Sequence, residues 1–353
     1  MQNLEYRTDW PVLMLYDVDP AWSEESIRER MDEVCQLVEG LKAVGHPVRR
    51  ALLESADLAA ILKKYAPDEI IVFNWCDDLP GIPRSCAMAA QILDQQGFTY
   101  TGANYQTLRL SQDKRKIKRL LKSAGIPTPA WQVFKPFHPT TWARFPAIVK
   151  PAFEHCSLGI TRDSVVQTPA ELTWRLNYVF EELLQPAIVE DFIDGREFHV
   201  GVIGNGALHV LPPGEIDYSG FHDIRDRLCT YESNFDKNSI AYHLTMPRMA
   251  CSLSNAEMEC LYDRVIRAYK VTHCRDYARM DVRLKDGEFF ILDVNHNADV
   301  GPETSLALGA QIIGYDYGHF GSFLINLAAQ RHRPWHERTT TDRLWQMKGT
   351  GTE

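Results

Sequence analysis

Short apolar runs alternate with segments of helical spacing over the first hundred residues. Four runs predict strands: 11–16, 47–53, 69–75 and 98–102. Three segments between them predict helices: one that Ser23 can cap, one over 56–65 and one over 85–95. This alternation predicts a parallel sheet with helices on both faces. Ligands of such sheets bind beyond the carboxyl ends of the strands, which here are 17–20, 74–78 and 102–104.

The pattern changes after about residue 105. A basic helix over 113–125 is expected to stop at Gly125 and Pro127. Further strands are expected over 147–150 and 187–193, and further helices over 169–184, 254–273 and 303–328. The stretch 218–245 has no clear period, as is typical of a lid or a disordered loop.

Composition narrows the class of protein. The chain has 353 residues, 45% hydrophobic and 24% charged, as in a globular enzyme of two or three domains. Its net charge of −9 argues against a nucleic-acid surface. We find no secretory signal and no apolar run long enough for a membrane span. The eight cysteines form no C-x-x-C pair, so we expect free thiols, no zinc site and a cytoplasmic location.

The segments 278–284 and 290–301 carry the strongest chemical signal. They predict a hairpin joined by the turn 285–288. Strand side chains repeat every two residues, so Asp293, Asn295 and Asn297 share a face, as do Arg279 and Asp281. Hard oxygen ligands beside a cation suit Mg²⁺ that holds phosphates. The alternative is the polar outer face of a solvated hairpin.

Two other segments suggest a nucleotide. The chain lacks a P-loop, but Lys150 ends an apolar strand and precedes a loop with Ser157 and Gly159, whose backbone N–H groups can meet phosphate. The strand that follows carries Glu190, which can accept an exocyclic amine, and then Glu197, which can bind ribose. The alternatives are an ordinary β-turn and exposed acids.

The order and spacing of these pieces resemble the ATP-grasp superfamily and, within it, the D-alanine–D-alanine ligase group. The resemblance runs from about Tyr100 to Leu327 and rests on YTGANYQTLRLSQDK, KPAFEHCSLGI and DVNHNADVGPETSL. It implies an α/β ATP-grasp fold with a pre-grasp domain over 1–105 and a central subdomain over 106–190. A C-terminal subdomain with the metal site would span 191–330, followed by a tail over 331–353.

The resemblance also implies site residues. ATP would be bound by Lys114, Lys150, Glu154, Ser157, Gly159, Glu190, Asp191, Ile193 and Glu197. Two Mg²⁺ ions, with Mn²⁺ able to replace them, would be bound by Asp281, Asp293 and Asn295. Phosphoryl transfer would involve Arg279, Ser157 and Lys237, and substrate binding Ser305 and Leu306.

The chain departs from the family's pattern near the substrates. Asn234 stands where a lid lysine is expected, with Lys237 nearby, and Ala298-Asp299 replaces Pro-Gly. Asp293 stands in place of the usual Glu, and His155-Cys156 replaces small loop residues. The segment 74–85, with Asp77 and Asp78, replaces a His-Gly-x-x-Gly-Glu motif. The acid of the family's first loop has four candidates: Asp17, Asp19, Glu24 and Glu25.

We therefore predict a ligase that phosphorylates a carboxylate or enolised-ketone oxygen and joins it to the amine of an amino acid. Asp77, Asp78 and Asp299 favour a substrate with amine or polyhydroxyl character. The leading specific hypothesis pairs mycosporine-glycine with an amino acid; the alternative is a dipeptide ligase, and the alternative class is a nucleotide-binding module without turnover. Expected partners are small molecules, with no nucleic acid or membrane, and a homodimer stays open.

Overall fold

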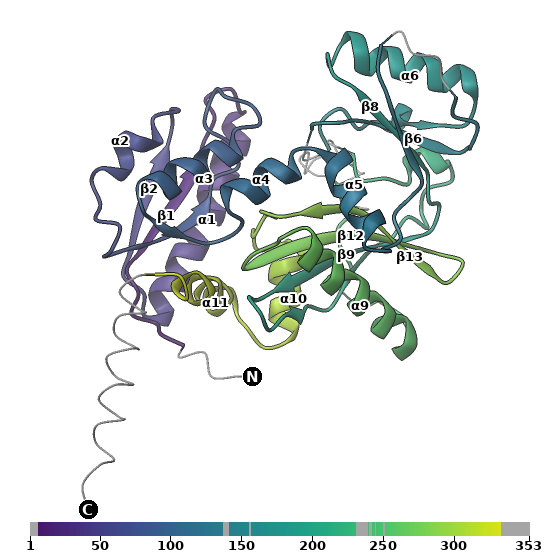
Figure 1. Cartoon of the computed structure of the whole chain (residues 1–353). Coiled ribbons are helices and arrows are strands. Elements are labelled where there is room, and N and C mark those ends of the chain that lie inside the picture. Colours follow the sequence, from purple (N-terminus) through teal and green to yellow (C-terminus); the bar gives the residue numbers. More distant parts are fainter. Residues whose placement is uncertain are drawn as a thin grey trace, which may run out of the picture.

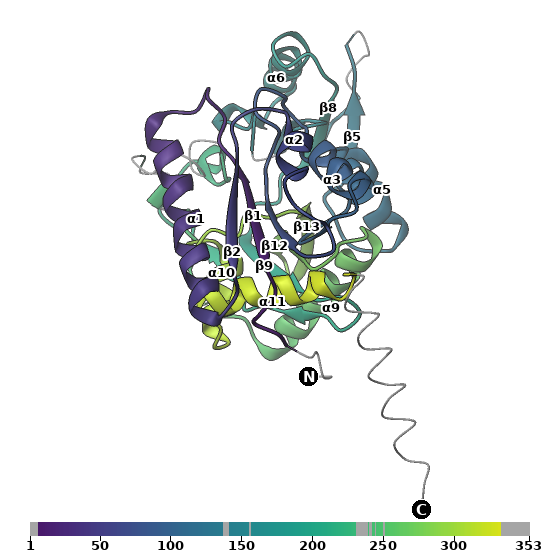
Figure 2. The same cartoon turned by 90° about the vertical axis from the view of Figure 1, so that its left-hand side faces the viewer.

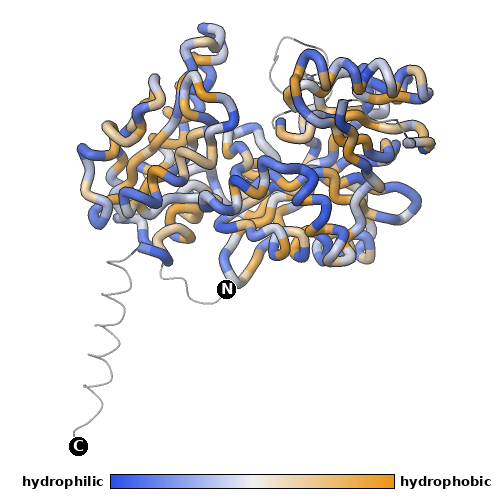
Figure 3. The backbone as a smooth tube through the Cα atoms, turned by 45° about the horizontal axis from the view of Figure 1, so that its top comes forward, coloured by the Kyte–Doolittle hydropathy of each residue, from blue (hydrophilic) through white to orange (hydrophobic). Residues whose placement is uncertain are grey.

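The computed structural model describes residues 6–136, 141–154, 157–230, 239, 242–243, 245–249 and 251–332. Their strands form three sheets, with an N-terminal module beside two further sheets that lie one above the other (Figure 1). Apolar stretches run through the interior of each part, as Figure 3 shows by hydropathy. Within the described ranges, no helix combines the length and apolar character needed to span a bilayer.

The N-terminal sheet is parallel, as predicted, with strand order β2-β1-β3-β4. Its strands are β1 (Val12–Asp17), β2 (Val48–Leu53), β3 (Ile71–Trp75) and β4 (Thr99–Tyr100). Its helices are α1 (Glu24–Val44), α2 (Leu58–Leu62), α3 (Cys86–Gln95) and the C-terminal α11 (Tyr317–Ala329). Apolar side chains of α1 and α11 cover one face, and those of α2 and α3 cover the other.

Helices α1 and α11 cross at a pair of glycines (Figure 2). A Cβ atom on Gly40 would lie 2.9 Å from the Cα atom of Gly318, and one on Gly318 would lie 2.4 Å from Gly40 O. Any larger residue at either position would push the two helices apart. This crossing packs the last described helix directly against the first.

The middle sheet is antiparallel, with order β5-β8-β6-β7. Its strands are β5 (Trp131–Phe134), β6 (Ala147–Pro151), β7 (Val165–Val166) and β8 (Ala187–Asp191). Helix α6 (Pro169–Glu181) packs on it after Thr168, whose side chain accepts from Glu171 N. The 3₁₀ helices η1 (Arg162–Ser164) and η2 (Ile224–Asp226) pack beside it, and η2 lies in the stretch that showed no period.

The third sheet is antiparallel, with order β10-β9-β12-β13 and β11 paired to β9. Its strands are β9 (Arg196–Ile203), β10 (His209–Val210), β11 (Gly214–Ile216), β12 (Tyr277–Lys285) and β13 (Glu288–Asn295). Helices α5 (Lys114–Ser123) and α9 (Asn255–Val271) cover it. Asp286 and Gly287, at φ 51° and 77°, make the predicted hairpin turn.

One expectation about the helices was wrong, and one helix was not predicted. The segment 303–328 is two helices, α10 (Ser305–Ile312) and α11, because Gly314 turns at φ 96° and Asp316 caps a new helix by accepting from His319 N. Helix α4 (Tyr105–Ser111), which Asn104 caps, was not predicted. Both caps are short polar residues of the kind that begins helices.

Two helices pack against sheets that are formed by distant parts of the chain. Ile117 and Leu121 of α5 lie in the core of the third sheet, although α5 precedes the middle sheet in sequence. Phe320 and Leu324 of α11 lie in the core of the N-terminal module. The three sheets are formed by successive segments of the chain, but their hydrophobic cores also include helices from other segments.

Candidate active site

Four polar side chains lie together on one face of the β12–β13 hairpin. Asp281 lies opposite Asp293, and Arg279 lies opposite Asn295. Arg279 Nε donates to Asp281 Oδ1 at 2.7 Å, and Asn295 Nδ2 donates to Asp281 Oδ2 at 2.9 Å. Lys114 of α5 forms an ion pair with Asp293. The structure thus brings together the carboxylates, amide and guanidinium that the sequence placed on one face.

Strand β9 continues this polar face. Glu197 lies opposite Arg283, and His199 lies opposite Asp281. Arg283 Nε donates to Glu197 Oε2 at 2.7 Å, and both side chains are almost fully buried. Burial raises the pKa of Glu197, but Arg283 and His199 outweigh it and lower this pKa to about 2. Glu197 is therefore ionised at neutral pH.

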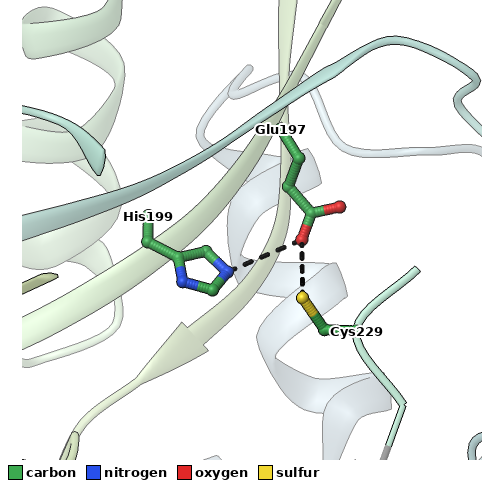
Figure 4. Close-up of side chains that lie close together, drawn as sticks. All are labelled: Glu197, His199 and Cys229. Atoms are coloured by element: carbon green, nitrogen blue, oxygen red, sulfur yellow. Dashed lines mark hydrogen bonds and ion pairs between the residues drawn. The ribbon is translucent and has the colours of Figure 1, made fainter. Parts of the chain in front are cut away.

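Glu197, His199 and Cys229 converge at one end of the polar face (Figure 4). Glu197 Oε1 lies 3.6 Å from His199 Nε2, and the Cys229 thiol donates to it at 3.7 Å. These ligand atoms lie within 4.8 Å of one another, a spacing that a metal ion can bridge. Burial raises the pKa of the Cys229 thiol, however, and Arg283 already neutralises Glu197. We interpret the trio as a hydrogen-bonded wall.

The facing wall comes from the middle sheet and α5. Glu190 of β8 is 1% exposed and lies between two lysines. Lys150 Nζ is 3.2 Å from Glu190 Oε2, and Lys118 Nζ is 3.2 Å from Oε1. Burial raises the pKa of Glu190, but the two lysines outweigh it and lower this pKa. A buried, ionised acceptor therefore faces the polar hairpin.

One pocket lies between these walls. The predicted residues that line it are Lys114, Lys150, Glu154, Ser157, Glu190, Asp191, Ile193, Glu197, Arg279, Asp281, Asp293 and Asn295. Gly159 is not among the lining residues; it adopts φ +73°, and a Cβ atom there would lie 2.7 Å from Leu183 Cδ1. Gly159 therefore shapes the loop through its backbone.

Glu154 and Ser157 are each held by a side-chain hydrogen bond. Gln185 Nε2 donates to Glu154 Oε1 at 2.7 Å, and Ser157 Oγ donates to Cys229 O at 3.0 Å. His155 and Cys156 lie outside the described residues, as do Asn234 and Lys237. The role of Lys237 stays a prediction.

A second group of charges lies at the carboxyl ends of β1 and β3. Asp17 Oδ1 accepts from Asp77 N at 2.9 Å, Arg30 pairs with Asp77, and Trp75 Nε1 donates to Asp299 Oδ1 at 3.1 Å. Burial, with the charge of Asp77, raises the pKa of Asp17 to about 7. Asp17, Asp77 and Asp299 all act electrostatically on Arg30. Glu33 is a fourth carboxyl group that acts on this guanidinium, and burial also raises the pKa of Asp77. When they are ionised, these carboxyl groups favour a further positive group.

Asp78 and Leu306, two further predicted substrate residues, have different surroundings. The carboxylate of Asp78 accepts backbone N–H bonds at the start of α3 from Arg84, Ser85 and Cys86, at 3.0, 2.6 and 2.8 Å. These bonds cap the start of α3, and the substrate contact of Asp78 stays a prediction. The side chain of Leu306 is fully buried in the apolar core, so its backbone is what can meet a substrate.

Ser305 is 3% exposed, and within the described part of the chain its Oγ has no hydrogen-bond partner. A buried hydroxyl without a partner is costly unless something else binds it. This geometry fits the predicted contact of Ser305 with a substrate carboxylate.

Several residues at these sites were not predicted from the sequence, among them Arg30, Trp75, Lys118 and Arg283. Three of these four had a signal. Lys118 follows Lys114 by one helical turn, and Arg283 follows Asp281 on the same strand face. Trp75 lies at the carboxyl end of β3, where ligands were expected. Arg30 had no signal, because its partner Asp77 is brought close by tertiary packing alone.

The middle and third sheets enclose one pocket that is lined by both lysines and carboxylates, in keeping with the ATP-grasp fold that the sequence resembled. The crystal structure of D-alanine–D-alanine ligase from Bacillus anthracis complexed with ATP has a TM-score of 0.68 at 18% identity, covering 92% of this chain and 99% of that chain. The ligase from Coxiella burnetii has a TM-score of 0.68 at 19% identity, covering 97% and 99%. These likenesses show the fold.

The sequence shows the family. The family model described as D-ala D-ala ligase C-terminus matches residues 120–318, more than half of the chain. The D-alanine–D-alanine ligase of Aquifex aeolicus (strain VF5) is 28% identical over 295 residues, 82% of this chain and 92% of that protein. Uncharacterized protein y4sG of Sinorhizobium fredii is 28% identical over 305 residues, 84% and 87%. The chain belongs to the D-alanine–D-alanine ligase family and is an ADP-forming carbon–nitrogen ligase.

Proposed function

We propose that this ligase transfers the γ-phosphoryl group of ATP to a carboxylate oxygen of one amino acid and joins the acyl phosphate to the amine of a second. The products are an amide, ADP and phosphate. The observation that carries this proposal is the grouping of Arg279, Asp281, Asp293 and Asn295, which faces Lys150 across one pocket. Cations and oxygen ligands in one pocket are what phosphoryl transfer requires.

The pocket offers separate contacts for the parts of ATP. Glu190, with Asp191 and Ile193 beside it, would meet adenine. Glu197 is an ionised acceptor that suits ribose hydroxyls. Lys114 and Lys150 would neutralise the α- and β-phosphates.

The donor set fits Mg²⁺. Asp281, Asp293 and Asn295 offer hard oxygen ligands on one face, and this ion prefers such ligands. Arg279 and Asn295 each donate to a different oxygen of Asp281, and a carboxylate has about four acceptor positions. Bound Mg²⁺ would neutralise charge on the phosphate oxygens. We propose two ions, with Mn²⁺ able to replace them.

Residues of the chain would also stabilise the transferred group, limit the entry of water and bind the second amino acid. Arg279 would stabilise the charge that develops on the transferred phosphoryl group. The segment 157–160, tied to Cys229 through Ser157, would limit entry of water, which hydrolyses an acyl phosphate. Ser305 Oγ would hold the carboxylate of the second amino acid.

For the substrates we favour two amino acids. The curated relative from Aquifex aeolicus named above is a D-alanine–D-alanine ligase, so dipeptide formation has its support, whereas the pairing with mycosporine-glycine has none. The group of Asp17, Asp77 and Asp299 around Arg30 would receive an ammonium group.

The test is phosphate release from ATP with pairs drawn from the twenty L-amino acids and D-alanine, with mycosporine-glycine plus an amino acid as a further arm. We expect at least one amino-acid pair to stimulate release, with the dipeptide seen by mass spectrometry. If no arm stimulates release while ADP still binds, the protein is a nucleotide-binding module and not a ligase.

Asp299→Asn is expected to raise the KM for the amine substrate by roughly tenfold, with the KM for ATP unchanged. The amide oxygen can still accept from Trp75 Nε1, so the variant removes charge and keeps that hydrogen bond. Steady-state kinetics with each substrate varied measures this. Asp286→Asn, in the exposed hairpin turn, is the matched control. An unchanged KM for the amine would remove Asp299 from the substrate site.

A further inference from the structure

Lys118 is a buried lysine to which the ligase chemistry assigns no role. We propose that Lys118 is a positioning residue that keeps Glu190 an ionised acceptor and thereby makes the nucleotide site select adenine over guanine. The inference rests on the proposed binding of ATP in this pocket. It concerns the base and is independent of which amino acids are joined.

The geometry ties Lys118 into a chain of contacts that spans both sheets. Thr128 Oγ1 donates to Ile291 O of β13 at 2.8 Å and accepts from Lys118 Nζ at 2.8 Å. Lys118 Nζ then lies 3.2 Å from Glu190 Oε1. Lys150, on the neighbouring strand β6, contacts the other oxygen of Glu190. The carboxylate of Glu190 is thus held from the third sheet and from the middle sheet.

Lys118 acts through Glu190 and not on the nucleotide. It is 3% exposed and is absent from the lining of the pocket, whereas Lys114 and Lys150 both line it. Lys150 would also serve the phosphates of a bound nucleotide. Lys118 is then the lysine dedicated to Glu190.

The charge state of Glu190 decides which base fits. An ionised carboxylate only accepts hydrogen bonds, and two of its roughly four acceptor positions face lysines. It can accept from the exocyclic amine of adenine, but it repels the carbonyl oxygen that guanine presents at the same place. Without Lys118, a buried Glu190 tends to take up a proton, and a protonated acid can donate to that carbonyl.

Burial lowers the pKa of Lys118 against the opposing charges of Glu190 and Asp293, and with the smaller effect of Lys150 the result is about 8. Lys114, on the same helix, also carries charge nearby. Lys118 is therefore protonated below about pH 8 and loses its charge above it. We expect the affinity for ADP to fall as the pH rises through 8, and Lys118→Arg to remove that fall.

The experiment measures binding of ADP and GDP to the full chain by titration calorimetry at pH 7, without either amino acid. We expect Lys118→Met to weaken ADP by roughly tenfold and to leave GDP unchanged or tighter. Lys118→Arg should restore the preference. Lys122→Met, at an exposed position of the same helix, is the matched control, and thermal melting checks folding.

A double variant tests whether Lys118 affects the choice of base through Glu190 or only supports the structure of the site. In Glu190→Gln, adding Lys118→Met should change the ADP to GDP ratio no further, because the residue through which Lys118 acts is gone. Equal loss for both nucleotides, no loss, or the same further loss in the Glu190→Gln background would each overturn the inference. Failure of the unsubstituted protein to bind ADP would instead overturn the proposed function.

Discussion

Asp293→Ala is expected to lower amino-acid-dependent phosphate release by about a thousandfold or more while the chain stays folded. Asp293 offers a carboxylate to the proposed Mg²⁺ and pairs with Lys114 beside the phosphates. Its side chain is 30% exposed, so its removal opens no sealed cavity in the core. Initial rates of phosphate release at saturating ATP, with a melting curve for each protein, measure the effect.

The matched control is Asp286→Ala, which removes a carboxylate from the exposed turn of the same hairpin and should keep the full rate. Asp293→Glu, which restores a carboxylate with a longer reach, should recover part of the activity. A folded Asp293→Ala protein with undiminished turnover would contradict the metal role.

Arg283→Met is expected to reduce the free energy of unfolding by about 3–5 kcal/mol, the largest effect on stability that we predict. Arg283 donates to Glu197 Oε2 and to Ile193 O, each at 2.7 Å, and its side chain is 3% exposed. The substitution leaves Glu197 charged and buried without its main partner. Denaturant unfolding, monitored by fluorescence, measures the loss.

Two controls define the cause. Arg267→Met breaks an exposed pair with Asp263 and a hydrogen bond to Ala124 O, and it should cost no more than about 2 kcal/mol. Adding Glu197→Gln to Arg283→Met should recover stability, because it removes the unpaired charge. A small loss in the single variant, similar to that of Arg267→Met, would show that the buried pair contributes little.

The same pair predicts a dependence on pH. The pKa of Glu197 falls from 4.5 to about 2 in the folded chain, so the folded state binds the proton more weakly than the unfolded state. The stability from this group is complete above about pH 4.5 and is lost as the pH falls toward 2. In Arg283→Met this loss of stability in acid should become smaller.

Much of the fold could be predicted from local patterns. The runs 11–16 and 69–75 are apolar on both faces, as in a buried parallel strand, and they became β1 and β3. The hairpin was predictable because the two-residue repeat of strands orients Arg279, Asp281 and Asp293 without knowledge of the rest of the chain.

Other features depend on segments far apart in the chain. The crossing of α1 and α11 requires glycine at both 40 and 318, and neither glycine alone indicates the other. The separate start of α11 at Asp316 was missed because the apolar period of α10 continues across Gly314. Periodicity alone therefore overestimated the length of one helix.

The sequence by itself determined the strands, the polar face of the hairpin and the likeness to a ligase family, because each depends on the spacing of residues near one another. Tertiary structure alone decided that Glu190 lies between Lys118 and Lys150, that Arg283 neutralises Glu197, and which charges surround the proposed substrate. Electrostatic energy depends on distance and burial, and both are set by packing between elements that the order of residues does not place together.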